Sequence, residues 1–183
     1  MTKKAPQETR ARLIQAAIDL VVAEGAAHLT LDAVARAAQV SKGGLLHHFP
    51  SKEALLRGIA ERAEQLWRER FAHELAQEPE GQPGRWSRAY IRATFDRRAE
   101  ETLLMQALTR VIAIYPALME SWREVYEKAW EQLTDDDLPE ARALTIQVAC
   151  DGIWLGEVAG LPLIPDNLRA HVRADLLRLT YDS

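Results

Sequence analysis

The decisive stretch of this sequence is TLDAVARAAQVSKGGLLHHFPSK, residues 30–52. Its first part predicts a short helix, because the Thr30 hydroxyl is placed to cap an N-terminus and Asp32 suits the positive end of the helix dipole. Apolar residues recur in this part at helical spacing, at Leu31, Val34, Ala35 and Ala38. One face of this helix must therefore pack on another element.

A second short helix is predicted over Lys42–His48. The helical period breaks ahead of it, and Ser41 is a second candidate N-cap. Pro50 ends the helix, because the residue before a proline avoids the helical region, and Ser51 is placed to cap the next helix. Two helices joined by a tight turn, the second carrying donors and a basic residue, form a helix-turn-helix arrangement.

The segment VSKGGLLHHFPSKEALL, residues 40–56, resembles the DNA-binding domain of the tetracycline-repressor (TetR) family. The match rests on Val40-Ser41 before the second helix, His48-Phe49 at its end and Lys52 at the start of the next helix. The resemblance implies that the second helix enters the major groove of double-stranded DNA. The residues expected to form the DNA-binding surface are Thr30, Ser41, Lys42, Gly43, Gly44, His47, His48 and Lys52.

These residues have different expected roles. Lys42 and His47 are candidates for base edges or phosphates, and Gly43 and Gly44 would let the backbone approach DNA closely. Thr30, His48 and Lys52 would hold phosphates, whereas Ser41 caps the helix.

Two positions depart from the family pattern. The family usually has Tyr where this chain has Leu46, so a hydroxyl that would reach a phosphate is lost. It often has Gly where this chain has Gln39, and a Gln there costs about 1 kcal/mol if the turn needs a positive φ. Phosphate contacts are distributed over several groups, so neither departure excludes DNA binding.

The charge is divided unevenly along the chain. Residues 1–52 hold seven Lys/Arg against four Asp/Glu, a net +3, whereas the remainder carries −7 within a whole-chain charge of −4. A segment of +3 is only modestly basic for a DNA-binding domain. Two copies acting together are therefore expected, as a homodimer.

Composition places the protein among soluble intracellular chains. The single Cys150 excludes an intrachain disulfide framework. The N-terminus has no apolar core of a signal peptide, and the apolar run from Val148 to Pro165 contains Asp151, Glu157 and Pro162, which argue against a membrane span. A cytoplasmic protein without a membrane partner is expected.

The remaining chain predicts an all-α fold with no strand-length alternation. Helices are expected over residues 8–24, 51–76, 85–98, 101–115, 116–133, 140–159 and 167–180, after a polar arm at residues 1–8 with Lys3 and Lys4. The predicted domains are a three-helix, helix-turn-helix DNA-binding domain at residues 1–52 and a helical ligand-binding and dimerisation domain at residues 53–183. The long helix at 51–76 would link them.

The helix at 140–159 is apolar on nearly all sides, which indicates burial against its own domain and a second subunit. The resemblance implies the same, because members of the family dimerise through a four-helix bundle from the last two helices of each subunit. The expected dimer-interface residues are Leu144, Val148, Leu155, Leu168, Val172, Leu176 and Leu179.

Large and soft side chains spread over the central helices favour a ligand pocket. The candidates are Trp86, Phe95, Met105, Leu108, Met119, Trp122 and Trp154. For any one of these residues, a place in the ordinary core is the stronger alternative. Cys150, Asp151 and Glu157 are polar groups on an apolar helix, and the sequence leaves open whether they face a ligand, the dimer seam or a capping partner.

The pattern favours a ligand-responsive transcriptional regulator, with repression of a palindromic operator as the expected mode. The effector would be a small molecule of unknown identity, and its binding would tilt the helix at 51–76. A helical dimeric adaptor without DNA binding is the alternative. An enzyme is not expected, and no cofactor or metal is, because the sequence has no Gly-rich phosphate loop, nucleophile elbow or metal-spaced Cys/His set.

Overall fold

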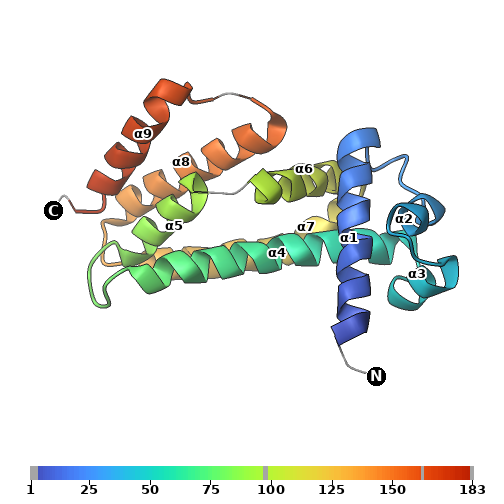
Figure 1. Cartoon of the computed structure of the whole chain (residues 1–183). Helices are drawn as coiled ribbons and strands as arrows, with labels where there is room; N and C mark the ends of the chain where they lie inside the picture. The colour runs from blue at the N-terminus through green and yellow to red at the C-terminus, as the bar shows by residue number, and fades with distance from the viewer. Residues whose placement is uncertain (1–3, 97–98, 162, 182–183) are drawn as a thin grey trace. The chain divides into compact units, whose positions relative to one another are not determined.

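A computed structural model describes residues 4–96, 99–161 and 163–181, with side chains for all of these except residues 4, 5, 99, 119, 121, 122, 125, 126, 133 and 134. Every regular element in these ranges is a helix, as the all-α prediction requires (Figure 1). In chain order they are α1 (Lys4–Glu24), α2 (Leu31–Ala37), α3 (Lys42–His48), α4 (Lys52–Gln77), α5 (Arg85–Phe95), α6 (Ala99–Ile114), the 3₁₀ turn η1 (Pro116–Leu118), α7 (Met119–Thr134), α8 (Glu140–Ala159) and α9 (Asp166–Arg178).

The start of α1 corrects the prediction of a polar arm at residues 1–8. Helix α1 begins at Lys4, four residues earlier than expected, and Lys3 lies outside the described residues. Pro6 falls in the first turn, where its missing N–H costs nothing because no intrahelical partner exists there. The proline is therefore compatible with an early helix start.

The contacts between residues divide the chain into two compact units. The first unit contains residues 1–64 and 103–119, and the second contains residues 65–102 and 120–183. Helices α4 and α6 each contribute residues to both units. The predicted boundary at residue 52 concerns which residues serve DNA and which serve a ligand, and it stays a prediction.

The first unit packs α1 and α3 against α2. Its core includes the fully buried Leu13, Val21, Val34, Leu45, Leu55, Leu56 and Ile59. Phe49 packs on α4 at Gly58, where an added Cβ would lie 2.8 Å from the ring. Gly58 is thus a close-approach position between the end of α3 and α4. Residues from α6 complete this unit, and Arg110 there donates to the Val21 carbonyl at 3.1 Å.

The second unit is organised around α5, which packs on α8 and α9. Its apolar core comprises Trp86, Tyr90, Ile91, Phe95, Ala143, Ile146, Cys150, Ile153 and Leu176. A buried polar cluster stabilises the N-terminus of α5. The Asp136 carboxylate accepts hydrogen bonds from the Trp86 and Ser87 backbone N–H groups at 2.6 and 2.8 Å. Asp136 thereby satisfies two N–H groups that have no partner inside the helix.

The same end of α5 holds a buried ion pair. The Arg88 guanidinium donates to the Glu78 carboxylate at 2.6 Å, and their side chains are only 2% and 4% exposed. Arg92 also contacts Glu78, at 2.8 Å. These charges tie the chain that follows α4 to the start of α5.

In the single chain, helix α8 is buried on one face and exposed on the other, and the expected burial of the exposed face against a second subunit stays a prediction. One face, with Ala143, Ile146, Cys150 and Ile153, lies in the core of the second unit. The other face leaves Leu144, Val148 and Leu155 exposed by 40%, 61% and 55%. Within the described part of the chain, no helix is both long and apolar enough to cross a membrane.

Candidate functional site

Both helices of the helix-turn-helix segment have the predicted caps. The Thr30 hydroxyl oxygen accepts a hydrogen bond from the Ala33 N–H at 3.2 Å, and the Ser41 oxygen accepts from the Gly44 N–H at 3.1 Å. A hydroxyl that accepts in this way still has its own hydrogen to donate. The hydroxyl groups of Thr30 and Ser41, both exposed, can therefore still donate a hydrogen bond to an anion such as a phosphate.

The turn between α2 and α3 has the strained backbone that the sequence indicated. Gln39 adopts a φ of 54°, in the left-handed region that glycine prefers. The Val40 N–H donates to the Ala35 carbonyl at 2.9 Å and closes the turn. The positive φ on which the expected cost depends is therefore present at Gln39.

The two lysines expected to bind DNA are held by partners within the first unit. Lys42 lies 3.1 Å from the Asp32 carboxylate, with both side chains more than half exposed. Lys52 donates to the Ala27 carbonyl at 3.1 Å. A solvent-exposed pair of this kind is weak. The Lys42 ammonium can therefore exchange Asp32 for a phosphate at little cost.

The remaining candidates on α3 differ in their surroundings. Gly43 is open, with nothing within 4 Å of an added Cβ, whereas a Cβ on Gly44 would approach Val40 at 3.0 Å and Ser41 at 3.2 Å. A side chain at position 44 would therefore crowd its own turn, and the predicted role of Gly44 in a close approach to DNA stays a prediction. His47 is exposed and His48 half-buried, with their rings edge to face at 5.4 Å. Leu46, in place of the usual Tyr, is 39% exposed.

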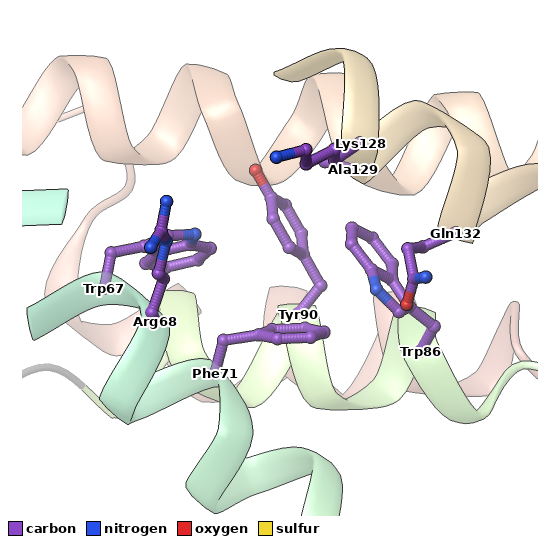
Figure 2. A pocket seen from close by; sticks show the side chains of 8 residues that line it. All are labelled: Trp67, Arg68, Phe71, Trp86, Tyr90, Lys128, Ala129 and Gln132. Carbon is purple, nitrogen blue, oxygen red and sulfur yellow. The ribbon is translucent and has the colours of Figure 1, made fainter. Parts of the chain in front are cut away.

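Four aromatic side chains of the second unit form one connected cluster beside a cavity (Figure 2). Trp86 and Tyr90 of α5 stack with centroids 5.0 Å apart and planes 13° from parallel. Phe71 of α4 tilts against Trp86 at 5.0 Å, and Trp67 meets Tyr90 edge to face at 5.4 Å. We call these four residues the aromatic cluster.

The cavity next to the aromatic cluster has a volume of about 180 Å³. Arg68 of α4 and three residues of α7 complete its lining, namely Lys128, Ala129 and Gln132. Its lining combines aromatic rings with the nitrogen donors of Arg68, Lys128 and Gln132. Such a combination is typical of small-molecule sites.

The residues predicted to bind a ligand fall in different places. Trp86 lines the cavity, whereas Phe95 is buried in the core beneath the Arg169 guanidinium, 5.2 Å from its ring centroid. Met105 and Leu108 are buried and belong to the first unit, and Trp154 is half-buried. The side chains of Met119 and Trp122 lie outside those described. Their predicted role stays a prediction.

Sequence reasoning missed Trp67, Phe71 and Tyr90 as lining residues. A signal was present, because Trp67 and Phe71 are four residues apart, as are Trp86 and Tyr90. Residues at this spacing lie on one face of a helix. Two aromatic pairs on two helices would have predicted a shared aromatic wall.

The polar groups on α8 have distinct surroundings. The Tyr90 hydroxyl donates a hydrogen bond to the Asp151 carboxylate, so Asp151 contacts one member of the aromatic cluster. Burial raises the pKa of the Cys150 thiol to about 12, an effect that the nearby Asp151 charge adds to and a hydrogen bond from Thr94 opposes. A neutral buried thiol is a poor nucleophile. Glu157 forms an ion pair with Arg169 at 2.5 Å.

The candidate dimer residues divide by exposure. Leu144, Val148 and Leu155 lie on the exposed face of α8, and Leu168 of α9 is 45% exposed. Val172 and Leu179 are half-buried against the core, and Leu176 is 7% exposed within it. A second, more open cavity of about 610 Å³ lies between α7 and α8 and is lined by Trp130, Leu144, Val148 and Asp151 among others. The exposed apolar side chains of the second unit thus include three on α8, and Leu161 and Leu163 in the loop that follows it are also exposed, by 57% and 58%.

Among the side chains that the structure describes, no group of three or more His, Cys, Asp or Glu residues is arranged to hold a metal ion.

Two family descriptions match most of the chain. Residues 84–181 match the family described as "Tetracyclin repressor-like, C-terminal domain". Residues 13–59 match "Bacterial regulatory proteins, tetR family".

Individual relatives agree with these matches. Over 53 residues the chain is 42% identical to the HTH-type transcriptional regulator SrpR of Pseudomonas putida, a stretch that covers 29% of this chain and 25% of SrpR. A TetR-like transcriptional regulator from Rhodococcus sp. RHA1 has the same fold at 18% identity, with a TM-score of 0.69 over 96% of this chain and 95% of that one. NalD, the secondary repressor of the MexAB-OprM multidrug efflux pump in Pseudomonas aeruginosa, superposes at 22% identity with a TM-score of 0.61 over 96% and 97% of the two chains.

Proposed function

Because the chain belongs to the tetR family of bacterial regulatory proteins, we propose that it is a ligand-responsive transcriptional regulator that represses a palindromic operator as a homodimer. The observation that carries the proposal is the capped helix α3, which presents Lys42, Gly43 and His47 on an exposed surface beside the strained turn at Gln39. In a helix-turn-helix the second helix lies in the major groove and its N-terminal residues contact base edges.

In this proposal α3 lies in the major groove of each half-site. Lys42 leaves Asp32 for a phosphate or a base edge, and His47 reaches the neighbouring base. The hydroxyl of Thr30 and the side chains of His48 and Lys52 hold phosphates on either side, and Ser41 caps α3. Phosphate contacts of this kind position the protein, whereas base-edge contacts give sequence preference.

The proposed dimer forms through the exposed face of α8. Leu144, Val148 and Leu155 form an apolar strip along it, and Leu168 of α9 adds to the exposed apolar surface. Apolar surface of this kind is stabilised when a second copy covers it. A twofold dimer also matches a palindromic operator, since each α3 then meets an equivalent half-site.

The proposed effector binds at the aromatic cluster. Helix α4 supplies Phe71 to that cluster and also carries Leu55 and Leu56 in the core of the first unit, so one continuous helix contributes to both. Effector binding changes operator affinity only if the effector prefers one arrangement of the dimer over another. Movement of α4 is the proposed means of coupling.

The family and the fold point to a regulator of transcription, and we propose that the protein acts in the cytoplasm without turnover or a cofactor. The alternative of a dimeric adaptor without DNA binding gains no support from the relatives, which include proteins named as repressors.

The test begins with selection of bound sequences from a random pool of DNA duplexes. Affinity for the selected duplex is then measured against salt concentration, for wild type, Lys42→Ala and the control Arg178→Ala, whose exposed side chain pairs with Asp175. Loss of Lys42 should reduce the magnitude of the log–log salt slope by about 0.9 for each phosphate contact removed. Failure to select any sequence would overturn the DNA-binding assignment, and identical slopes in all three proteins would remove Lys42 from the phosphate contacts.

A further inference from the structure

The cavity beside the aromatic cluster also indicates the chemical class of the effector. We propose that it binds a compact aromatic anion, a single ring that carries a carboxylate. This inference rests on the proposed function only in calling the occupant an effector. The size, ring surfaces and charge of the cavity each contribute to it.

The volume limits the occupant to about one ring. The cavity measures about 180 Å³. An engineered apolar cavity of about 150 Å³ in another protein accommodates benzene. A single ring with one small substituent therefore fills this space, and a larger polycyclic compound requires the helices to separate.

The aromatic cluster offers ring surfaces for stacking. Trp86 and Tyr90 stand nearly parallel, and Phe71 is tilted by 50° against Trp86. Figure 2 shows these rings gathered between α4 and α5, with α7 on the opposite side. Aromatic pairs favour offset-stacked or edge-to-face contact, so we expect a planar guest to meet the lining rings in one of these two arrangements.

The charge of the lining residues determines which planar molecules the cavity favours. The described lining residues include two cations, Arg68 and Lys128, and no carboxylate. They approach from two different helices, α4 and α7. Arg68 has a further interaction of its own, so Lys128 is the principal candidate to bind an anionic group. An anion held between an ammonium and a guanidinium gains charge-assisted hydrogen bonds.

Aromatic rings can instead attract a cation. In this cavity a cationic guest would lie beside Lys128 and Arg68 and be repelled by both. The Asp151 carboxylate accepts the Tyr90 hydroxyl hydrogen and is not among the lining residues. The geometry therefore favours an anion over a cation of the same shape.

Calorimetric titration of the full-length protein with three probes of similar size tests the charge preference. Benzoate is the anion, benzamide its neutral isostere and benzylammonium the cation. We expect benzoate to bind about tenfold more tightly than benzamide, the effect of one partly exposed charge-assisted hydrogen bond, and benzylammonium to bind most weakly. Quenching of tryptophan fluorescence locates the site, because Trp67 and Trp86 line the cavity.

Substitutions then assign the preference to its residues. Lys128→Gln and Arg68→Gln should each lower benzoate affinity by about fivefold to tenfold and leave benzamide affinity unchanged. The matched control is Arg57→Gln, which removes the same charge from the exposed Arg57–Glu53 pair of α4. It should leave both affinities unchanged.

Three outcomes would overturn the inference: tighter binding of benzylammonium than of benzoate, equal binding of benzoate and benzamide, or no binding of any probe. None of them affects the proposed function, because operator binding is measured without effector. Conversely, a protein that binds benzoate as described but selects no DNA sequence would retain the anion site and lose the regulator assignment.

Discussion

The helix-turn-helix segment and the aromatic cavity are built in opposite ways. In the segment, each decisive contact joins residues that are close in sequence, such as Ser41 and Gly44 or Thr30 and Ala33. In the cavity, Phe71, Trp86 and Lys128 come from three helices and meet only after the second unit has folded. The first region is set by local hydrogen bonding, and the second by long-range packing.

The ion pairs of the two regions also differ, in how far they are exposed to solvent. The Lys42–Asp32 pair is more than half exposed and stands ready to exchange partners. The Arg88–Glu78 pair near the aromatic cluster is almost fully buried and has a structural role. An exposed pair adds little stability, whereas removal of one partner from a buried pair leaves an uncompensated charge.

The largest expected effect tests this contrast. Arg88→Met leaves Glu78 buried with Arg92 as its remaining partner, so the free energy of unfolding should fall by about 3 kcal/mol, the lower end for a broken buried pair. The measurement is urea denaturation followed by tryptophan fluorescence. Arg57→Met is the control, because its pair with Glu53 is exposed and should cost about 0.3–0.5 kcal/mol. Similar losses in both variants would show that burial of the pair is unimportant.

A smaller loss is expected at the close approach between α3 and α4. Gly58→Ala gains about 1 kcal/mol of helix propensity, but overpacking costs about 1–3 kcal/mol. Phe49 is 3% exposed, and its ring would have to shift to make room for a Cβ at 2.8 Å. We expect a net loss of about 1 kcal/mol in urea denaturation.

Gly43→Ala is the matched comparison. Its Cβ would meet nothing within 4 Å, so stability should rise rather than fall. Operator affinity should nevertheless decrease if the α3 backbone approaches DNA at this position. A stable Gly43→Ala variant with unchanged operator affinity would remove Gly43 from the DNA-binding surface.

A substitution in the turn between α2 and α3 should increase stability. Gln39→Gly removes the penalty for a side chain at a φ of 54° and should stabilise the protein by about 0.5–1 kcal/mol after the greater freedom of glycine in the unfolded chain is deducted. Gln39→Asn should fall between Gly and Gln, because asparagine tolerates this conformation. Thermal and urea denaturation measure both variants, and a less stable Gly variant would contradict the strain at this position.

The smallest expected effect is at Cys150. Burial raises its pKa from 9.0 to about 12, so the folded state favours the protonated thiol. This contribution to stability is complete below pH 9 and is lost as the pH rises from 9 towards 12. Iodoacetamide near neutral pH should leave the native protein unlabelled and operator binding unchanged, while urea-unfolded protein reacts. Rapid labelling of the folded protein would indicate an accessible thiolate.

The sequence predicted the elements whose causes are local. The caps at Thr30, Ser41 and Ser51 were each predicted from one residue and are present, because a capping bond spans only three residues. Comparison with the glycine that the family often has at position 39 raised the question of a positive φ there, and the structure answers it with a φ of 54°. Most helix bounds agree within a few residues for the same reason.

The sequence was less informative where a contact joins distant segments. Asp136 caps α5 from about 50 residues away, and nothing in its loop indicates this role. The sequence could not say which face of α8 packs on its own unit and which is left for a second subunit, because hydrophobicity measures the tendency of a side chain to be covered, not which element covers it. Leu176 and Val148 are both apolar, yet one packs in the core of its own unit and the other is exposed.

By itself, therefore, the sequence determined the family, the all-α fold and the helix-turn-helix segment, because caps, turns and helical periodicity act over a few residues. Only the tertiary structure decided which aromatic side chains share a wall, which cations line the cavity and which leucines are exposed. Those outcomes depend on the packing of whole helices, and many sequence positions contribute to each of them.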